Sequence, residues 1–443
     1  MSGFSSKQRK VAYIVAIVLL SIPIVTLGMP AGEKGSEGQA GGVLAQLRTR
    51  MELGEPTMGD VDPSSATMNL VLLGLRGLAT DLLWIDYLHL QETKNWAQMR
   101  STVDSIILLQ PHFKKVWQHN GWNLAWNVSA EWDAVEDRFF WVKEGAKFLK
   151  KGSARNQNVA PIFFDIGRVL GQKIGTADER QFYRAFFKAD PDKARFNGGP
   201  DPEVNPNEKD NYLAASDAYA AANEVELKYP QRERHRVVFR QYPAQSVLSY
   251  ANALQDEGNF GEVTRGAWAD GFQRWTGEFG QETFKSRIGD VRLEMDDEAI
   301  DAAAKEQNVR ADDLRNAVDS LQKMINYRYW RTRALSESEL TTEQAHREIY
   351  EGQQLFKESK LREAKEKLLS GLTKFEEVLK KYPTIGSEDD AIDEILTAQL
   401  YWRYILQIQQ EPVPRDFPLR KIWDTQQARI PELDRLFKRD NGL

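Results

Sequence analysis

Residues 345–382 read AHREIYEGQQLFKESKLREAKEKLLSGLTKFEEVLKKY, and their pattern decides the fold. Apolar residues recur at steps of three and four, which is typical of amphipathic helices rather than of strands. Small residues stand at Gly352, Ala364 and Gly371, where they would allow two antiparallel helices to approach closely. We therefore expect a tight helical hairpin in which Ala364 lies in the contact and the neighbouring Lys365 lies in solvent.

The same spacing resembles a tetratricopeptide repeat (TPR), except that Pro383 falls about two helical turns late. Nearer the N-terminus, Trp117-x3-Gly121 and Phe163-x3-Gly167 repeat the aromatic-to-glycine opening 46 residues apart. A strict period of about 34 residues is missing. The sequence therefore predicts an all-α fold, in which an N-terminal transmembrane helix is followed by a degenerate, TPR-like array of helical hairpins.

The composition of the 443 residues narrows the class of protein. With 41% hydrophobic and 28% charged side chains, the chain can bury a core large enough for about two or three domains. The formal charge of −6 argues against a broad basic face for nucleic acid. The absence of cysteine excludes disulfide scaffolds, thiolate metal sites and cysteine nucleophiles.

The N-terminus has the pattern of a membrane anchor. Lys7, Arg9 and Lys10 precede an uncharged, mostly apolar run at 11–28, which at about 1.5 Å per residue is long enough to span a bilayer as a helix. A cleaved signal peptide is the alternative, but its apolar core is shorter, about 7 to 15 residues, and it ends at a small-x-small site. By the positive-inside rule, residues 1–10 form a cytoplasmic tail, and the body lies on the periplasmic side of a bacterial inner membrane.

Two segments follow the predicted anchor. Residues 29–66 are rich in glycine and proline, which is typical of a flexible tether. Residues 68–84 are apolar again, but Arg76 and Asp81 make a second crossing costly in lipid. We therefore expect one crossing and interpret the second run as a buried or membrane-surface helix.

The remaining chain is expected to fold in several helical parts. The clearest break is at 188–211, where four prolines and many charges argue against a helix and against a core. The predicted parts are a TPR-like helical domain with a tryptophan cluster at 67–190, a loop at 191–211, a helical middle region at 212–335 and a C-terminal region of TPR-like hairpins at 336–443.

Local signals predict where several helices begin. Thr341 with Gln344, and Ser387 with Asp390, have the spacing of capping boxes, in which side chains bond to free backbone N–H groups. The acidic run at 294–298 is expected to open a further helix, because acidic side chains in a first turn interact favourably with the helix dipole.

Five blocks of the sequence carry a resemblance to a known group of proteins. They are LLGLRGLATDLLW (72–84), LQPHFKKVWQHNGWNLAWNVSAEWD (109–133), DIGRVLGQKIG (165–175), INYRYWRTRA (325–334) and PVPRDFPLRKIW (412–423). These blocks resemble a group of uncharacterised, membrane-anchored planctomycete proteins, some of which are labelled "iron responsive element". The resemblance extends from about residue 60 to the C-terminus and implies no established activity, ligand or catalytic position.

Metal and catalytic motifs are scarce. A helical di-iron site takes Glu-x-x-His pairs from two helices, whereas this sequence has one such pair, Glu343 with His346. No nucleophile elbow, Walker A loop or dinucleotide-binding glycine motif is present. We therefore expect no metal, no cofactor and no catalytic residues, and we favour a protein that is not an enzyme. The other histidines are His89, His112, His119 and His235, without ligand spacing.

The tryptophan cluster is the candidate interaction surface. Trp117, Trp122, Trp126 and Trp132 lie close together in the sequence, and Trp122 and Trp126 are one helical turn apart. Such rings pack between helices or line a groove for a sugar or a peptide. We expect a membrane-anchored, extracytoplasmic helical scaffold that binds other proteins without catalysis. The alternative is an extracytoplasmic module that uses the aromatic cluster to bind or transform a ligand such as a glycan or a metal.

Overall fold

The computed structural model describes residues 76–230 and 235–442, together with Val15 and Leu19. The predicted tail at 1–10 and tether at 29–66 lie outside the described residues, as does the anchor at 11–28 apart from Val15 and Leu19. Within the described residues, none of the helices combines the length and the apolar character that a membrane crossing needs.

The described chain is all-α apart from one short hairpin of strands, and it divides into two compact units. The first unit comprises the described parts of Met1–Val169 and Ala221–Gln231, and the second those of Leu170–Ala220 and Arg232–Leu443. The all-α prediction is confirmed. The elements before Val169 are α4 (Arg76–Glu92), α5 (Trp96–Leu109), α6 (Lys114–Asn123), η2 (Leu124–Val128), η3 (Ser129–Glu131), α7 (Val135–Arg155) and α8 (Ala160–Arg168).

The later elements follow the same helical pattern. They are η4 (Val169–Lys173), α9 (Ile174–Thr176), α10 (Arg180–Lys188), α11 (Lys193–Phe196), α12 (Asn211–Lys228), α13 (Arg236–Arg240), α14 (Tyr242–Asp256), α15 (Glu262–Gln273), η5 (Arg274–Glu278), η6 (Phe279–Gln281), β1 (Phe284–Lys285), β2 (Asp290–Val291), α16 (Asp297–Gln307), α17 (Ala311–Met324), α18 (Tyr327–Glu337), α19 (Leu340–Lys357), α20 (Leu361–Lys381), η7 (Ile385–Ser387), α21 (Asp389–Ile408), α22 (Arg420–Thr425) and α23 (Ile430–Asp440).

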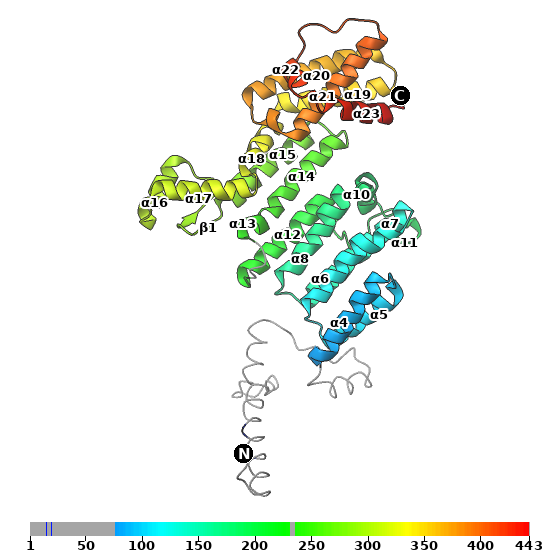
Figure 1. Ribbon diagram of the computed structural model, residues 1–443, viewed down its shortest axis with the longest axis vertical. Coiled ribbons are helices and arrows are strands. Elements are labelled where there is room, and N and C mark those ends of the chain that lie inside the picture. Colours follow the sequence, from blue (N-terminus) through cyan, green and yellow to red (C-terminus); the bar gives the residue numbers. More distant parts are fainter. Residues whose placement is uncertain (1–14, 16–18, 20–75, 231–234, 443) are drawn as a thin grey trace. The chain divides into compact units, whose positions relative to one another are not determined.

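The first unit is built from helices that pack on their sequence neighbours (Figure 1). Between α4 and α5 the chain turns at Lys94, which has φ +54°, and the Asn95 side chain caps α5 by accepting the Gln98 N–H at 3.3 Å. The side chains of Tyr87 and Ile106 are fully buried between these helices. Helix α5 therefore returns along α4 as an antiparallel hairpin.

Glycines bring α6 and α7 into close contact. A Cβ atom added at Gly145 would lie 2.7 Å from the Gly121 carbonyl oxygen, and one at Gly152 would lie 2.9 Å from the Trp117 ring. Distances this short exclude any side chain larger than hydrogen unless the helices separate. The glycines thus fix the spacing of this hairpin, and α8 packs on both of its helices.

Both α6 and α15 end in a π-helical turn followed by a turn of 3-10 helix. These turns are η2 and η3 after α6, and η5 and η6 after α15. A π turn inserts one residue into the helical repeat and so rotates the side chains that follow it. Trp126 lies in the first π turn and Trp275 in the second.

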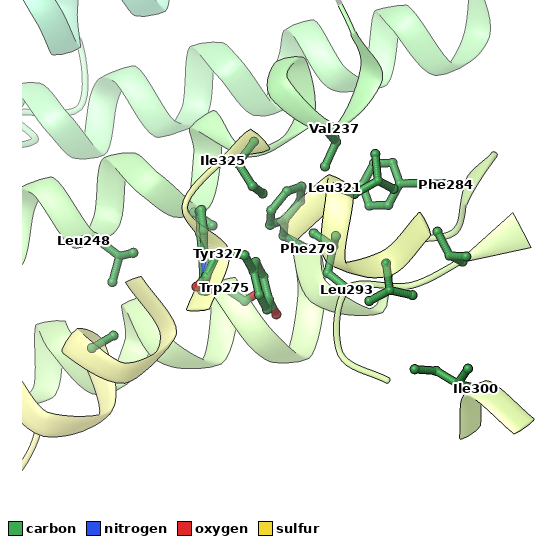
Figure 2. Packing of buried hydrophobic residues seen from close by; sticks show 14 of the residues in the cluster. Val237, Leu248, Trp275, Phe279, Phe284, Leu293, Ile300, Leu321, Ile325 and Tyr327 are labelled. Carbon is green, nitrogen blue, oxygen red and sulfur yellow. The ribbon is translucent and has the colours of Figure 1, made fainter. Parts of the chain in front are cut away.

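The second unit has a large apolar core beside α15 and α18 (Figure 2). The rings of Trp275 and Tyr327 stack with their centroids 5.4 Å apart, and Phe279 lies 5.2 Å from Trp275. The Trp275 indole N–H donates to the Tyr327 carbonyl oxygen at 3.2 Å. These contacts join the end of α15 to the start of α18 although 52 residues separate Trp275 from Tyr327 in the sequence.

A small subdomain at 284–324 is inserted between those two helices. Its strands β1 and β2 pair antiparallel, with Phe284 opposite Val291. Helix α16 then begins at Asp297, and the Asp296 side chain caps it by accepting the Ala299 N–H at 2.8 Å. The prediction that the acidic run opens a helix is confirmed.

Residues 345–382, which predict a tight hairpin, belong to α19 and α20, and these two helices form an antiparallel hairpin. Ala364 is fully buried, as predicted, and a Cβ atom added at Gly352 would lie 2.6 Å from Leu368. Lys365 does not lie free in solvent, because its side chain is only 23% exposed and its ammonium pairs with Glu411 at 2.8 Å. That prediction was wrong, because the chain after α21 returns to cover the start of α20.

The predicted capping boxes lie near the right helices, but neither one caps its helix. Helix α19 begins at Leu340, so Thr341 is already inside its first turn. The carboxylate of the N-cap residue Glu339 bonds to Lys381 and Tyr382 instead. Ser387 belongs to the 3-10 turn η7 that precedes α21. At the start of α19, partners from the end of α20 thus bind the N-cap side chain in place of a local capping box.

The proline-rich segment at 188–211 is more ordered than its composition suggests. It contains the short helix α11, and it buries Asp201 and Asn205. The Asn205 side-chain amide donates to the carbonyl oxygens of Phe187 and Lys209 at 3.1 and 2.9 Å. Buried amide and carboxylate side chains, together with the buried apolar side chain of Val204, thus order this segment.

Candidate binding surface and buried charge network

Trp117 is a core residue and does not belong to an interaction surface. Its ring is 0% exposed and packs against Phe148, with the centroids 4.9 Å apart. Its indole N–H donates to the Pro111 carbonyl oxygen at 2.9 Å, so the polar edge of the ring is satisfied inside the protein. The inclusion of Trp117 in the candidate surface is therefore corrected.

Trp122 and Trp126 stack on each other at the end of α6. Their ring centroids are 6.0 Å apart with an interplanar angle of 13°, as expected for residues one turn apart on one face. Trp122 is 36% exposed, whereas Trp126 is partly buried and has the Arg168 guanidinium 5.7 Å from its ring centroid. One tryptophan of this pair therefore presents a ring to solvent and the other supports it.

Trp132 lies in the extended link between η3 and α7. Its ring is 42% exposed and stacks on Trp141, with the centroids 6.2 Å apart. Phe140 is 45% exposed and meets Trp141 edge-on at 5.4 Å. The Trp132 carbonyl oxygen accepts a hydrogen bond from Arg138 Nε at 2.6 Å, which holds the link against the first turn of α7. Two exposed rings thus flank one partly buried ring.

A polar contact between Tyr87 and His119 lies next to Trp122, whose ring centroid is 6.5 Å from that of His119. The Tyr87 hydroxyl is 3.0 Å from His119 Nδ1, and the Trp84 ring meets both residues. Burial, with a further contribution from nearby Lys115, lowers the pKa of His119, so that its imidazole is neutral at neutral pH. This contact joins α4 to α6.

The second unit contains a buried network of four charged side chains, contributed by α18, α19 and α21. His346 Nδ1 lies 2.7 Å from a Glu394 oxygen, and His346 Nε2 lies 3.1 Å from a Glu337 oxygen as an ion pair without good hydrogen-bond alignment. Arg333 Nε is 3.7 Å from the other Glu337 oxygen. These two cations and two anions balance, and the exposed carboxylate of Asp390 lies a further 3.8 Å from Arg333 Nη1.

Helix α14 supplies neutral partners to the same network. The Gln255 amide donates to Glu337 at 2.9 Å, and the Arg333 guanidinium donates to the Asn252 side-chain oxygen. The guanidinium carbon of Arg333 also lies 5.4 Å from the Trp268 ring centroid. These contacts surround Arg333 with an aromatic face and with oxygen atoms, as a buried guanidinium requires.

Both central groups of the network are charged at neutral pH. Burial alone would lower the pKa of His346, but Glu337 and Glu394 raise it well above its usual range. Burial alone would raise the pKa of Glu337, but His346 and Arg333 lower it to about 2. Because each charge is committed to a partner inside the protein, the network joins helices and offers no free acid or base.

The predicted Glu-x-x-His pair is split between different partners. Glu343 accepts the backbone N–H of Gly261 at 2.9 Å, whereas His346 belongs to the charge network. The two side chains therefore hold different elements of the second unit. In the described part of the chain, no three metal-ligating side chains come together.

A second buried cation organises the segment before α12. The Arg184 guanidinium pairs with Asp210 at 3.1 Å and with Glu257 at 2.7 Å, and it also donates to the Asn211 side chain. Its carbon lies 5.0 Å from the Tyr212 ring centroid. This arginine anchors the proline-rich segment at 188–211 to the end of α14.

Sequence reasoning found part of the exposed surface and missed the rest. Trp122 and Trp132, both candidates from the sequence, are exposed. Phe140 is exposed too, but it was not among those candidates. Its signal is the position one helical turn after Glu136, which lies in the acidic, solvated first turn of α7. The Arg333-x3-Glu337 spacing is a sign of a helical ion pair that was likewise overlooked.

Comparison of the chain with protein-family models, with curated proteins and with solved structures found no match. Its function therefore has to be inferred from the geometry and chemistry of its own residues.

Proposed function

We propose that the protein is a membrane-anchored, extracytoplasmic helical scaffold that binds other proteins through the aromatic surface of its first unit. The observation that carries this proposal is the exposure of Trp122, Trp132 and Phe140 within one short stretch of chain. Large rings in contact with water are unfavourable unless a partner covers them, and clustered exposed rings are typical of interaction sites.

A TPR-like array would suit this role. Its support comes from the glycines at helix contacts, Gly121 with Gly145 in α6 and α7, and Gly352 in α19. In each hairpin, small residues allow the close helix contact that repeat hairpins need, although Gly145 follows Gly121 at a spacing different from that of Ala364 after Gly352. Arrays of stacked hairpins present extended surfaces, and these commonly bind proteins.

The proposed anchor and orientation rest on the sequence. The basic cluster Lys7, Arg9 and Lys10 before the apolar run at 11–28 supports a cytoplasmic N-terminus and a body on the periplasmic side. Protease added to spheroplasts should then digest the body and spare the anchor. Protection of the body from protease would reverse the orientation.

Stacking of the rings leaves room for a partner. Trp122 is stacked on Trp126 and Trp132 on Trp141, so each exposed ring has one face occupied, and its other face and its edges remain free. A glycan could also use these faces, and it is the alternative that the capture experiment distinguishes. The partners of Glu343 and His346 commit both residues to the protein itself, which weighs against the metal alternative.

Capture of partners tests the proposal. Full-length protein in detergent-solubilised membranes should be cross-linked, and the bound proteins of the wild type should be compared with those of a Trp122→Ala/Trp132→Ala variant. Val263→Ala is the matched control, since Val263 is an exposed apolar residue on α15. We expect specific partners to be lost in the double variant alone. Unchanged capture by the double variant would refute the proposed surface, and retention on glycan beads instead would favour the ligand-binding alternative.

A further inference from the structure

Three unpaired carboxylates surround the exposed rings at the start of α7. Asp133, Glu136 and Asp137 are exposed, and over the described ranges their side chains have neither a hydrogen bond nor an ion pair. We call them, with Trp132 and Phe140, the acidic–aromatic patch. The class of partner inferred for this patch rests on the proposed protein-binding function.

Helical spacing places the members of the patch together. Glu136 lies four residues before Phe140, and Asp137 lies four residues before Trp141, so each carboxylate is about 5 to 6 Å from the ring one turn later when measured between Cβ atoms. Trp132 is drawn to the same place by its stacking on Trp141. Carboxylates and rings therefore alternate over one small area.

Nearby cations offset only part of these charges. Lys94 pairs with Glu131 at 2.7 Å, so those two charges cancel each other. Arg138 Nε donates to the Trp132 carbonyl oxygen, which is neutral, so Arg138 keeps its positive charge and offsets one of the three carboxylates. The positive end of the α7 dipole amounts to about half an elementary charge, which is small beside three carboxylates. An excess of negative charge thus surrounds the exposed rings.

We propose that the acidic–aromatic patch binds a segment of a partner protein that is rich in arginine or lysine. Cations are attracted to the faces of tryptophan and phenylalanine, and carboxylates pair with the same cations. Arginine fits better than lysine, because its planar guanidinium stacks on a ring and pairs with a carboxylate at the same time. Phosphate-bearing partners such as nucleic acid or an anionic membrane would be repelled.

The size of the patch sets the length of the segment. From Asp133 to Phe140 the chain advances seven residues, or about 10 Å if all are taken as helical. An extended chain covers that distance with about three residues at about 3.3 Å each. A segment with two or three cations within about five residues would therefore fill the patch.

A defined peptide tests the inference on the full-length protein in detergent. The probe is fluorescein-labelled Gly-Arg-Gly-Arg-Gly-Arg-Gly, and its anisotropy is followed during titration with protein at low and at high salt. The corresponding lysine and glutamate peptides serve as comparisons. We expect the arginine peptide to bind more tightly than the lysine peptide, the glutamate peptide not to bind, and the affinity to fall with salt.

Matched variants assign the binding to the patch. Glu136→Gln/Asp137→Asn should weaken binding of the arginine peptide about tenfold, and Phe140→Ala should weaken it about threefold with less change in salt dependence. The control is Asp312→Asn/Asp313→Asn, which neutralises the acidic first turn of α17, and it should change affinity less than about twofold. All substituted side chains are exposed or partly exposed, so far-UV spectra should remain those of the wild type.

The outcomes separate this inference from the proposed function. Equal binding by both double variants would mean that the peptide responds to net charge alone, and the patch assignment would be overturned. No binding of the arginine peptide, with partner capture intact, would overturn the partner class and leave the scaffold proposal standing. The scaffold proposal itself would be refuted only if the Trp122→Ala/Trp132→Ala variant captured the same partners as the wild type.

Discussion

The contact between α19 and α20 makes a quantitative prediction for Gly371→Ala. A Cβ atom added at Gly371 would lie 2.9 Å from the Ile349 backbone nitrogen and 3.0 Å from the Ala345 carbonyl oxygen. Ordinary contact begins near 3.4 Å, so α19 and α20 would have to separate by about 0.5 Å. Because both obstacles are backbone atoms, no side-chain rotation can relieve the overlap.

Two opposing terms set the size of the effect. Overpacking of this kind costs about 1 to 3 kcal/mol, whereas replacing glycine by alanine inside a helix gains about 1 kcal/mol. The net effect of Gly371→Ala is therefore a destabilisation of about 0 to 2 kcal/mol. Gly266→Ala in α15 is the matched control, because nothing lies within 4 Å of its added Cβ atom. That substitution should stabilise by about 0.5 to 1 kcal/mol.

The difference between the two variants isolates the packing term, since both gain helix propensity. It should be about 1 to 3 kcal/mol, measured by urea unfolding of the full-length protein with hydrogen exchange of the amides in α15 and α20 as the local readout. If Gly371→Ala proved as stabilising as Gly266→Ala, the close approach of α19 and α20 would be refuted.

Other expected outcomes concern buried residues. Ala364→Leu should lower the free energy of unfolding in urea by about 1 to 3 kcal/mol, because Ala364 is fully buried. The control is Glu363→Leu, since Glu363 is exposed whereas Lys365 is partly buried, and it should change the free energy of unfolding by about 0.5 kcal/mol or less. His346→Gln leaves Glu337 without its imidazolium partner and should destabilise the second unit by about 3 to 5 kcal/mol. In the wild type, the free energy of unfolding should fall as pH rises above about 6.5, by up to about 1.4 kcal/mol per unit, because the native state keeps a proton on His346 that the unfolded state releases. The opposite slope in a pH series of urea titrations would contradict the assigned charge of His346. At low pH, stability should be lost below about 4.5, the usual pKa of glutamate, as Glu337 approaches its folded pKa of about 2.

Local chemistry explains what the sequence could predict. The helices and the buried Ala364 follow from three- and four-residue periodicity, and the start of α16 follows from the acidic run around Asp296. In each case the residues that decide the structure are neighbours in the chain, so a short stretch contains the whole signal.

Long-range partners explain what could not be predicted. Gln255 and Glu337 are 82 residues apart, and His346 and Glu394 are 48 apart, so no local pattern indicates that they meet. The same holds for Lys365, whose partner Glu411 arrives from beyond α21. The environments of Trp117 and Trp132 also depend on α7, where Gly152 and Trp141 contact them. Helix α7 follows the sequence block at 109–133 that contains both tryptophans.

The charge network has a consequence for how the second unit loses its structure. Stacked hairpins generally unravel one after another from an open end, because each touches only its neighbours. Here Arg333, Glu337 and His346 belong to α18 and α19, while Asn252 and Glu394 bring in α14 and α21. Detaching α21 would leave the buried imidazolium without Glu394, a step far less favourable than fraying an ordinary terminal hairpin. The C-terminal helices and α14 should therefore melt as a single cooperative block rather than in sequence.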